Sequence, residues 1–417
     1  MSSAKQSKPK GTQDFVPPES TRKRRIEQVA RSLAERYGFQ EIITPTFEHT
    51  EVFSKSSGAT SDIVTKEMYS FKDRAGRDLT LRPEGTPGVV RAVLENRLRM
   101  PCRLYYLGPF FRYGRPQKGR YREFWQLGVE ALGEADPMVD AEVVKFGVDF
   151  FHELGIDDCL TQITSIGCRE CRPAYREKLV GYLAGREKEL CPDCRVRLER
   201  NPLRIFDCKN ETCRLAVSEA PKPGRNLCAE CSRHAEKVLA ALDRWKLRYE
   251  INDRLVRGLD YYSRTTFEYI SDRLGAQDSM GGGGRYDYLV SEFGGPDTPA
   301  VGLAIGLERT AMAMPVEEAA QRRRLAFVIW LSEAELGPAV ELLEKLRVQG
   351  IPAQADFDAR KPKQQFKAAD AAGAACCVII GADELARGLY SLKDLTTGEQ
   401  FEIPQHTVVE HVRSLFR

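Results

Sequence analysis

An arginine in apolar surroundings is the first residue that points to chemistry. Arg257 lies in the segment RLVRGLDYYSRTTFEY (residues 254–269), between the apolar pairs LV and GL. A solvated loop would not surround a cation with apolar side chains, and a buried strand would not combine an arginine, a glycine and an aspartate. We therefore expect Arg257 to bind an anion, with an ion pair to Asp260 as the structural alternative.

A loop between two expected strands gathers more cations. Five basic residues and no acidic residue lie between positions 112 and 122, namely Arg112, Arg115, Lys118, Arg120 and Arg122. Guanidinium groups bind phosphate oxygens in pairs. The loop therefore predicts contact with phosphate or nucleic acid, and a solvated basic hairpin is the alternative.

The second of these strands has one polar face. Side chains alternate along a strand, so one face carries Phe124, Gln126, Gly128 and Glu130, and the other carries Trp125, Leu127 and Val129. An aromatic ring, an amide and a carboxylate on one face predict a pocket floor for a planar base and a cationic ligand. The opposite face would belong to the core.

Two later motifs suggest close approach to a small ligand. The run SMGGGG ahead of Arg285 has four glycines, which let backbone approach a ligand closely, although a flexible turn has the same pattern. In GLERTAMAM, Arg309 would open a helix whose amide donors suit a phosphate. Arginines at helix starts are also common on surfaces.

Eight of the twelve cysteines lie between positions 168 and 231. Cys168, Cys171, Cys191 and Cys194 have a spacing typical of zinc ribbons, and Cys208, Cys213, Cys228 and Cys231 would make a second four-thiolate site. We expect about two Zn²⁺ ions by the four-ligand rule, with a role in holding the segment together. How the eight residues pair stays open, and free thiols are the alternative.

These residues need elements to position them. We expect a helix over residues 22–37, a strand over 41–45, and a strand, loop and helix over 78–95, with Thr86 capping that helix and Pro87 in its first turn. Further expectations are two strands flanking the basic loop and a helix over 141–154. The charge run 321–324 predicts a linker or a helix end, followed by a small unit that alternates strands and helices.

Composition excludes several classes of protein. The 417 residues are 42% hydrophobic and 29% charged, with a net charge of +3, as in a multi-domain globular protein. None of the five histidines lies in a glycine-rich or basic motif, which argues against a Ser-His-Asp hydrolase. We find no membrane-length apolar run and no secretory signal, so we expect a cytoplasmic protein without a membrane partner.

Five motifs taken in order resemble one family. TLRPEGT, FFRYGRPQKGRYREFWQLGVE, RLVRGLDYY, GGRYD and GLAIGLER are similar to motifs of bacterial histidyl-tRNA synthetases, which are class II aminoacyl-tRNA synthetases. The resemblance covers nearly the whole chain and implies an α/β multi-domain fold with a mixed, mainly antiparallel sheet. It implies a catalytic domain over residues 1–320, a helical cysteine-rich insertion over 165–248, and an α/β anticodon-binding domain over 325–417.

The resemblance also implies roles for single residues. Arg257 and Arg112 would be catalytic and would contact the α-phosphate. The histidine site would comprise Glu84, Thr86, Arg112, Gln126, Glu130, Arg257, Tyr261 and Tyr262. The ATP site would comprise Arg112, Arg120, Phe124 and Arg309, with Mg²⁺ as cofactor. Arg115 and Gln117 would contact the acceptor end of the tRNA, and the family state is a homodimer.

Three positions depart from the family pattern. Gly114 stands where the family usually has a glutamate that contacts adenine. We therefore expect the pocket to lose this contact, with an effect on nucleotide affinity or selectivity. Trp125 replaces a common histidine, and strand alternation predicts a change in packing only. Tyr288 replaces a common glycine. The rival interpretations are a synthetase-like paralogue that regulates histidine biosynthesis and a non-catalytic zinc-binding RNA protein.

Overall fold

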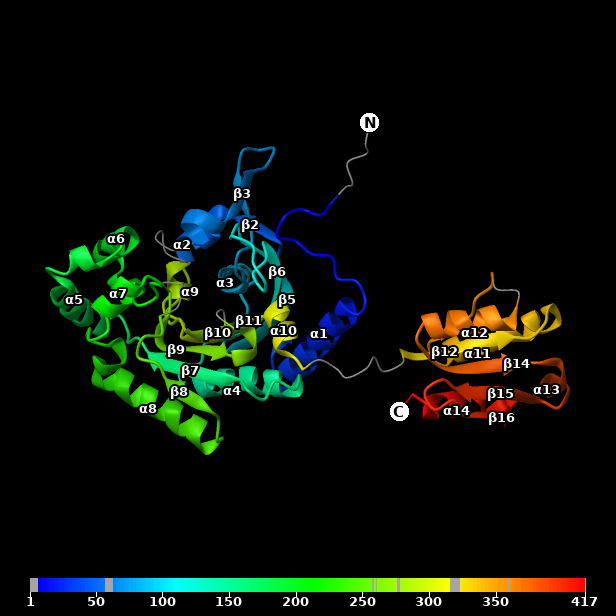
Figure 1. The fold of residues 1–417 in the computed structure, drawn as a ribbon. Helices are drawn as coiled ribbons and strands as arrows, with labels where there is room; N and C mark the ends of the chain where they lie inside the picture. Colours follow the sequence, from blue (N-terminus) through cyan, green and yellow to red (C-terminus); the bar gives the residue numbers. More distant parts are fainter. Residues whose placement is uncertain are drawn as a thin grey trace. The chain divides into compact units, whose positions relative to one another are not determined.

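The computed structural model describes residues 7–56, 63–256, 259, 261–275, 278–315, 323–358 and 361–416. The chain divides into two compact units, Met1–Pro315 and Val316–Arg417 (Figure 1). Arg257, Gly258 and Asp260 lie outside the described residues, as do positions 321 and 322 of the expected linker. The two arginines that follow belong to strand β12 (Arg323–Trp330). No helix within the described ranges is long and apolar enough to cross a membrane.

An eight-stranded sheet forms the centre of the first unit. From edge to edge its strands are β1 (Gln40–Glu41), β5 (Cys102–Phe111), β6 (Glu123–Leu132), β11 (Ala300–Gly306), β10 (Ser279–Arg285), β9 (Ser263–Ile270), β7 (Leu160–Ser165) and β8 (Tyr249–Ile251). Neighbouring strands are antiparallel except at the edges, where β1 pairs with β5 and β7 pairs with β8 in parallel. The mixed, mainly antiparallel sheet is therefore confirmed.

Helices cover both faces of this sheet. One face packs against α1 (Glu19–Arg36), α4 (Pro137–Glu153), α8 (Ala229–Arg244) and α10 (Leu307–Ala313), and the other packs against α3 (Thr86–Glu95) and α9 (Leu289–Glu292). The alternation expected for β6 is confirmed, because Leu127 and Val129 belong to the first core and Phe124 packs against the second. The two faces of β6 thus contact different cores, and Phe124, on the face predicted to line a pocket, packs against the second core.

A small sheet precedes α3 in the chain. It consists of β2 (Phe47–His49), β4 (Asp78–Leu81) and β3 (Tyr69–Lys72), next to α2 (Thr50–Ser56). The strand expected over residues 41–45 is wrong in extent, because β1 ends at Glu41. The Thr44 carbonyl instead accepts a hydrogen bond of 3.0 Å from the buried guanidinium of Arg82, so side-chain bonding replaces strand pairing there.

The glycine run is a central strand of the sheet, not a turn. A Cβ atom at Gly283 would lie 2.0 Å from the Gly302 carbonyl oxygen, and one at Gly284 would lie 2.5 Å from the Thr265 carbonyl oxygen. These two glycines therefore allow β10 to lie closely between β11 and β9. Gly281 and Gly282 also border the cavity described below, so close approach to a ligand stays a prediction for these two glycines.

The cysteine-rich segment is the connection between two neighbouring strands. Because β7 and β8 are parallel, the chain must cross over between them. This crossover contains α5 (Cys171–Leu183), α6 (Pro192–Arg200), α7 (Glu211–Ala216) and α8. It has a small apolar core of its own around Tyr175, Leu179 and Ile205. A core of this size favours additional cross-links.

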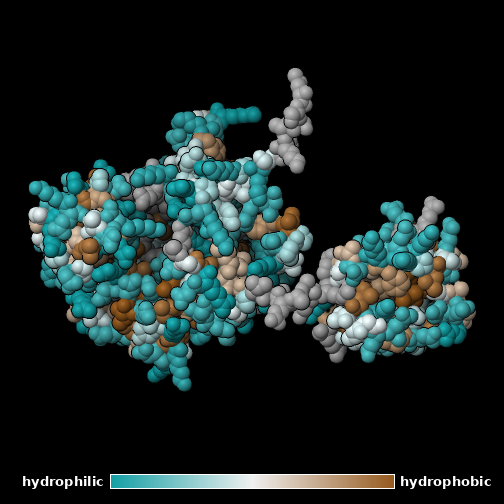
Figure 2. Space-filling model, viewed as in Figure 1, coloured by the Kyte–Doolittle hydropathy of each residue, from teal (hydrophilic) through white to brown (hydrophobic). Residues whose placement is uncertain are grey.

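The second unit is a five-stranded sheet with helices on both faces. Its strands lie in the order β13 (Ala353–Gln354), β12, β14 (Ala374–Ile380), β15 (Leu389–Asp394) and β16 (Gln400–Pro404), and its helices are α11 (Leu336–Val348), α12 (Pro362–Ala371), α13 (Ala382–Ala386) and α14 (Val408–Ser414). Val328 faces the core with α11 and α14, while Phe327 faces the core with α12. On the face shown in Figure 2 both units are mostly hydrophilic, and each also exposes an apolar patch.

Candidate functional site

A cavity of about 320 Å³ lies in the first unit where the start of α3, strands β6, β10 and β11, and the start of α10 converge. The residues predicted from the sequence that line it are Glu84, Thr86, Arg112, Arg120, Phe124, Gln126, Tyr261, Tyr262 and Arg309. They come from segments that lie far apart in the chain. The fold therefore brings the expected cationic, aromatic and acidic side chains into one cavity.

Two arginines are held at one end of this cavity by hydrogen bonds to backbone carbonyls. Arg112 Nε donates to the Pro83 oxygen at 2.8 Å, and Arg309 donates to the Gly119 and Ser279 oxygens at 3.1 and 2.6 Å. Burial lowers the pKa of both guanidinium groups below their usual value. Arginine stays protonated in proteins, so both remain fixed cations.

An aromatic ring and a third arginine complete this end. The Arg112 guanidinium carbon lies 5.2 Å from the centre of the Phe124 ring. Arg120 is more exposed and forms an ion pair with Glu67. A planar group stacked on Phe124 would thus lie beside fixed positive charge, which is the arrangement that a nucleotide needs.

The part of the cavity around Glu84, the acidic end, is polar, and the Glu84 charge also acts on Arg112. Tyr261 donates a hydrogen bond of 3.0 Å to Glu84, and the rings of Tyr261 and Tyr262 lie 4.8 Å apart. Gln126 Oε1 is buried, and no described residue donates a hydrogen bond to it. A buried amide oxygen without a donor is unfavourable. This atom is therefore a ready acceptor for a bound polar ligand.

Glu130 lies one layer behind the cavity wall. Its carboxylate accepts hydrogen bonds from Thr86 Oγ1 at 2.6 Å and from Tyr286 Oη at 2.5 Å. Burial raises the pKa of Glu130 to about 8, against the effect of both donors. The prediction that Thr86 caps α3 is wrong, because its hydroxyl is committed to Glu130 and Gly85 takes the cap position without a side-chain bond.

Two predicted residues lie elsewhere. Arg115 and Gln117 are exposed in the loop that joins β5 and β6. Arg257 lies outside the described residues, although its neighbour Leu259 lines the cavity.

The structure also accounts for two departures from the family pattern. Strand β5 ends at Phe111, so strand alternation does not place Gly114, which is absent from the described cavity lining. A Cβ atom at Gly114 would lie 3.1 Å from Arg120 Nε, so the missing side chain leaves room for that arginine. Trp125 packs against the core with the Lys23 ammonium 3.3 Å from its ring centre, which confirms a packing role.

Sequence reasoning missed several residues that shape the site. Tyr286 lines the cavity and donates to Glu130. Glu308 also lines it, and its two carboxylate oxygens accept hydrogen bonds of 2.9 and 3.1 Å from the backbone N–H of Trp125. Burial raises the pKa of Glu308 to about 7. The motif GGRYD contains Tyr286, so the sequence could point to this residue. It could not show that the partner of Tyr286 is Glu130 of β6.

A buried ionic network lies beneath the glycine-rich strand. Arg285 is 1% exposed and binds Asp140 at 2.6 Å, and Asp140 also accepts a hydrogen bond of 2.8 Å from Thr265. His234 of α8 pairs with the same carboxylate. The network therefore ties the cysteine-rich segment to α4 and β10.

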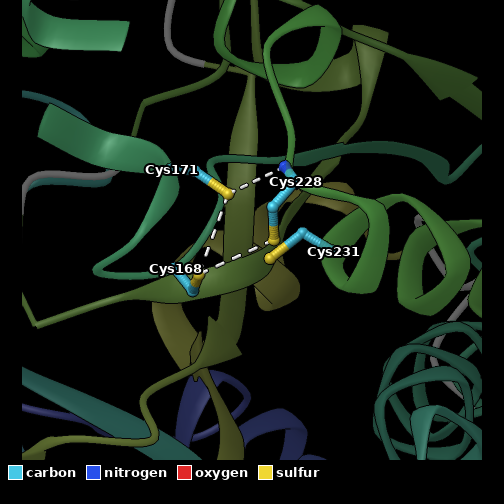
Figure 3. A group of neighbouring side chains, drawn as sticks. All are labelled: Cys168, Cys171, Cys228 and Cys231. Atoms are coloured by element: carbon cyan, nitrogen blue, oxygen red, sulfur yellow. Dashed lines mark hydrogen bonds between the residues drawn. The ribbon is translucent and has the colours of Figure 1, made fainter. Parts of the chain in front are cut away.

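The eight cysteines form two groups, and the grouping in sequence order is wrong. The proximal cluster is Cys168, Cys171, Cys228 and Cys231, and the distal cluster is Cys191, Cys194, Cys208 and Cys213. The first and last CxxC pairs come together because they lie at the two ends of the crossover. Figure 3 shows the four proximal side chains pointing toward one another.

The sulfur positions fit one tetrahedral metal ion in each cluster. Sulfur atoms lie 3.7 Å apart for Cys168 and Cys171, 4.0 Å for Cys168 and Cys228, and 3.8 Å for Cys191 and Cys208. A Zn–S bond of about 2.3 Å gives a tetrahedral edge of about 3.8 Å. In the proximal cluster the Cys231 backbone N–H is the main cause that lowers the pKa of the Cys228 thiol to about 7, whereas burial raises the pKa of Cys171 and Cys231.

Comparison with known proteins decides the family. The model of the histidyl-tRNA synthetase family matches residues 11–171 and 199–310. The histidine–tRNA ligase of Moorella thermoacetica is 47% identical over 415 residues, covering 98% of each chain. The chain belongs to the histidyl-tRNA synthetase family. A family model described as an anticodon binding domain matches residues 326–415.

Solved structures agree with this family. The crystal structure of apo histidyl-tRNA synthetase from S. aureus is 35% identical, with a TM-score of 0.80 and coverage of 98% of this chain and 99% of that one. A Bacillus halodurans protein described as an ATP phosphoribosyltransferase regulatory subunit/histidyl-tRNA synthetase is 22% identical, with a TM-score of 0.62, and covers 90% of this chain and 99% of its own. This second likeness concerns the fold alone.

Proposed function

We propose that this member of the histidyl-tRNA synthetase family is a histidine–tRNA ligase. It would activate L-histidine with ATP to histidyl-adenylate and transfer the histidine to the 3′ end of its tRNA. The cavity that joins the fixed cations Arg112 and Arg309 to the acidic end around Glu84 carries the proposal. A nucleotide and a cationic amino acid would fit side by side in one such cavity.

We propose Phe124 and the arginines as the nucleotide site. Adenine would stack on Phe124, Arg112 would bind the α-phosphate, and Arg120 and Arg309 would bind the outer phosphates. Activation joins a histidine carboxylate oxygen to the α-phosphorus as pyrophosphate leaves. Cations already held by backbone carbonyls stabilise the charge that develops on phosphate oxygens without reorganising.

Mg²⁺ would neutralise the phosphate charge when it is bound with ATP. The two carboxylates that line the described cavity, Glu84 and Glu308, both accept hydrogen bonds from the protein. We therefore expect the phosphates and water to supply most of its ligands, as is common for this ion.

The histidine site would lie at the acidic end. Glu84, Tyr261 and Tyr262 would surround the amino acid, Gln126 Oε1 would accept one of its N–H groups, and Thr86 would present a hydroxyl. Glu130 is placed to act through Thr86 and Tyr286, since its carboxylate bonds to both hydroxyls.

We propose Arg257 as a second catalytic cation. It would meet the α-phosphate and the histidine carboxylate. Leu259 and Tyr261, which follow it in the chain, both line the cavity and support this role.

The remaining parts of the chain would bind tRNA. We propose a catalytic domain over residues 1–320, an insertion over 165–248 that approaches the acceptor stem, and an anticodon-binding domain over 325–417. Arg115 and Gln117 would contact the acceptor end from their exposed loop. We also propose zinc at both cysteine clusters, a homodimer and action in the cytoplasm.

Aminoacylation separates this function from its rivals. Purified protein should charge the histidine tRNA with labelled histidine and no other amino acid. A regulatory paralogue would bind histidine without charging tRNA, and a zinc-binding RNA protein would bind tRNA without consuming ATP. Either of those outcomes would replace the proposal.

A further inference from the structure

The proximal cysteine cluster lies against the segment that carries the two cavity tyrosines. Arg172 follows the ligand Cys171 and donates a hydrogen bond to the backbone oxygen of Tyr262. The Gly167 oxygen, next to Cys168, accepts a hydrogen bond of 2.9 Å from the backbone N–H of Arg264. The loop that holds two of the ligands is thus bonded to both sides of Ser263, immediately after the tyrosine pair.

A second set of contacts joins the same loop to Tyr288 and to α9. The backbone N–H of Arg169, between the two ligands, donates to the Tyr288 hydroxyl at 3.2 Å, and its guanidinium carbon lies 4.0 Å from the centre of that ring. Arg169 also pairs with Glu292 of α9 at 2.7 Å. Tyr288 follows Tyr286, which lines the cavity. Tyr288, which replaces a glycine common in the family, therefore contacts the loop that holds Cys168 and Cys171.

The loop is shaped for its cysteines. Gly167 has φ +72°, and a Cβ atom there would lie 2.7 Å from Cys171 Cβ and 3.1 Å from its sulfur. Only glycine combines this backbone conformation with that closeness. The conformation that brings Cys168 to Cys171 is therefore the one that presents Arg172 and Gly167 to the tyrosine segment.

The distal cluster has different surroundings. Cys194 and Cys213 belong to the small apolar core of the crossover, and the backbone N–H of Cys191 donates to Cys213 sulfur at 3.1 Å. The Cys191 and Cys208 sulfurs lie 3.8 Å apart, and Arg195, next to Cys194, donates to the Glu187 and Leu190 oxygens at 3.0 Å. The distal cluster therefore belongs to the crossover's own apolar core, against which Val256 also packs.

We propose that each cluster binds one zinc ion and that the proximal zinc positions the histidine site. Histidine binding, and not tRNA charging alone, then depends on the proximal metal, whereas the distal metal serves only the crossover. This inference rests on the proposed function for its substrate. Arg172 acts as a positioning residue, because it touches the backbone of Tyr262 rather than the substrate.

The two clusters supply a matched pair of variants. Cys228→Ser removes a half-exposed proximal ligand and Cys208→Ser removes a half-exposed distal ligand. Full-length protein purified under reducing conditions without added metal should contain about two zinc ions per chain by the four-ligand rule, and each variant should lose one. In histidine-dependent pyrophosphate exchange, Cys228→Ser should raise the histidine KM at least about tenfold and leave the ATP KM within about twofold. Cys208→Ser should leave both within about twofold.

Further variants separate positioning from general damage. Cys228→His supplies another zinc ligand and should restore the zinc count and the histidine KM together. Arg172→Ala should raise the histidine KM while both zinc ions stay bound, and Arg172→Lys should recover part of the loss. Hydrogen–deuterium exchange gives a readout without activity: β9 should lose protection in Cys228→Ser and keep it in Cys208→Ser.

The inference and the proposed function fail in different ways. If the parent protein shows no exchange with histidine, the proposed function fails, while the zinc count and the protection of β9 still test the inference. A parent with less than about half an equivalent of zinc overturns the inference. An unchanged histidine KM or unchanged β9 protection in a Cys228→Ser protein that has lost one zinc overturns it too.

Discussion

Replacement of Glu130 by glutamine should change how the stability of the first unit depends on pH. Burial raises the pKa of Glu130 to about 8 in the folded protein, from a usual value of 4.5. Between these values the folded state holds a proton that the unfolded state has released. Stability from this group is therefore fully present below pH 4.5 and is lost as the pH rises through about 8.

The size of the effect follows from the two pKa values. Between pH 6 and pH 7.5, Glu130 should lower the free energy of unfolding by about 2 kcal/mol in the parent protein. Glu130→Gln keeps a neutral group of similar shape and has no proton to lose, so this contribution should vanish. Glu308 also has a raised pKa, but it is present in both proteins and cancels in the comparison.

Urea unfolding followed by tryptophan fluorescence provides the assay. A Trp330→Phe background leaves Trp125 and Trp245, which both lie in the first unit, as reporters. The difference in unfolding free energy between Glu130→Gln and the parent should grow in favour of the variant by about 2 kcal/mol from pH 6 to pH 7.5. Parallel pH profiles, within about 0.5 kcal/mol, would show that Glu130 is ionised at neutral pH and refute this reasoning.

Four other predictions concern the site and its support. Arg112→Ala should slow adenylate formation at least about a hundredfold, because one fixed cation beside a developing charge stabilises the transition state by roughly 3 kcal/mol. Single-turnover kinetics would measure this rate, and a change below about threefold would contradict the prediction. Arg257→Ala should have a similar effect in a folded protein, read by pyrophosphate exchange. Gln126→Leu should raise the histidine KM more than the ATP KM, because it removes the unpaired acceptor, and equal changes would count against that role. Asp140→Asn should lower the unfolding free energy by up to roughly 3–5 kcal/mol, because the buried Arg285 loses its closest carboxylate and keeps Asp287 at 3.1 Å. Calorimetry that shows an unchanged transition for the first unit would contradict it.

Local periodicity is enough to predict much of the first unit. The alternation between Phe124 and Trp125 assigned the two faces of β6 correctly because the side-chain period of a strand is fixed by its backbone. The cavity residues Arg112 and Gln126 could be found from residue types on one hairpin. Tyr261 and Arg309 joined them through the family resemblance, since no local rule brings distant segments together.

The misses share a physical cause. Thr86 was expected to cap α3, but the Glu130 carboxylate, 44 residues away in sequence, takes its hydroxyl. The spacing in sequence groups neighbouring CxxC pairs. The parallel pairing of β7 and β8 instead brings the two ends of the crossover together and places Cys168 beside Cys228. In both cases a contact between distant segments outweighed a local preference.

Histidine-dependent exchange of labelled pyrophosphate into ATP tests the central claim most directly. It needs no tRNA, so it examines the cavity alone. The proposed function predicts exchange with histidine and with no other amino acid, and a loss of at least about a hundredfold in Arg112→Ala, as expected for one fixed cation. A folded protein that binds ATP but supports no exchange with histidine would contradict it.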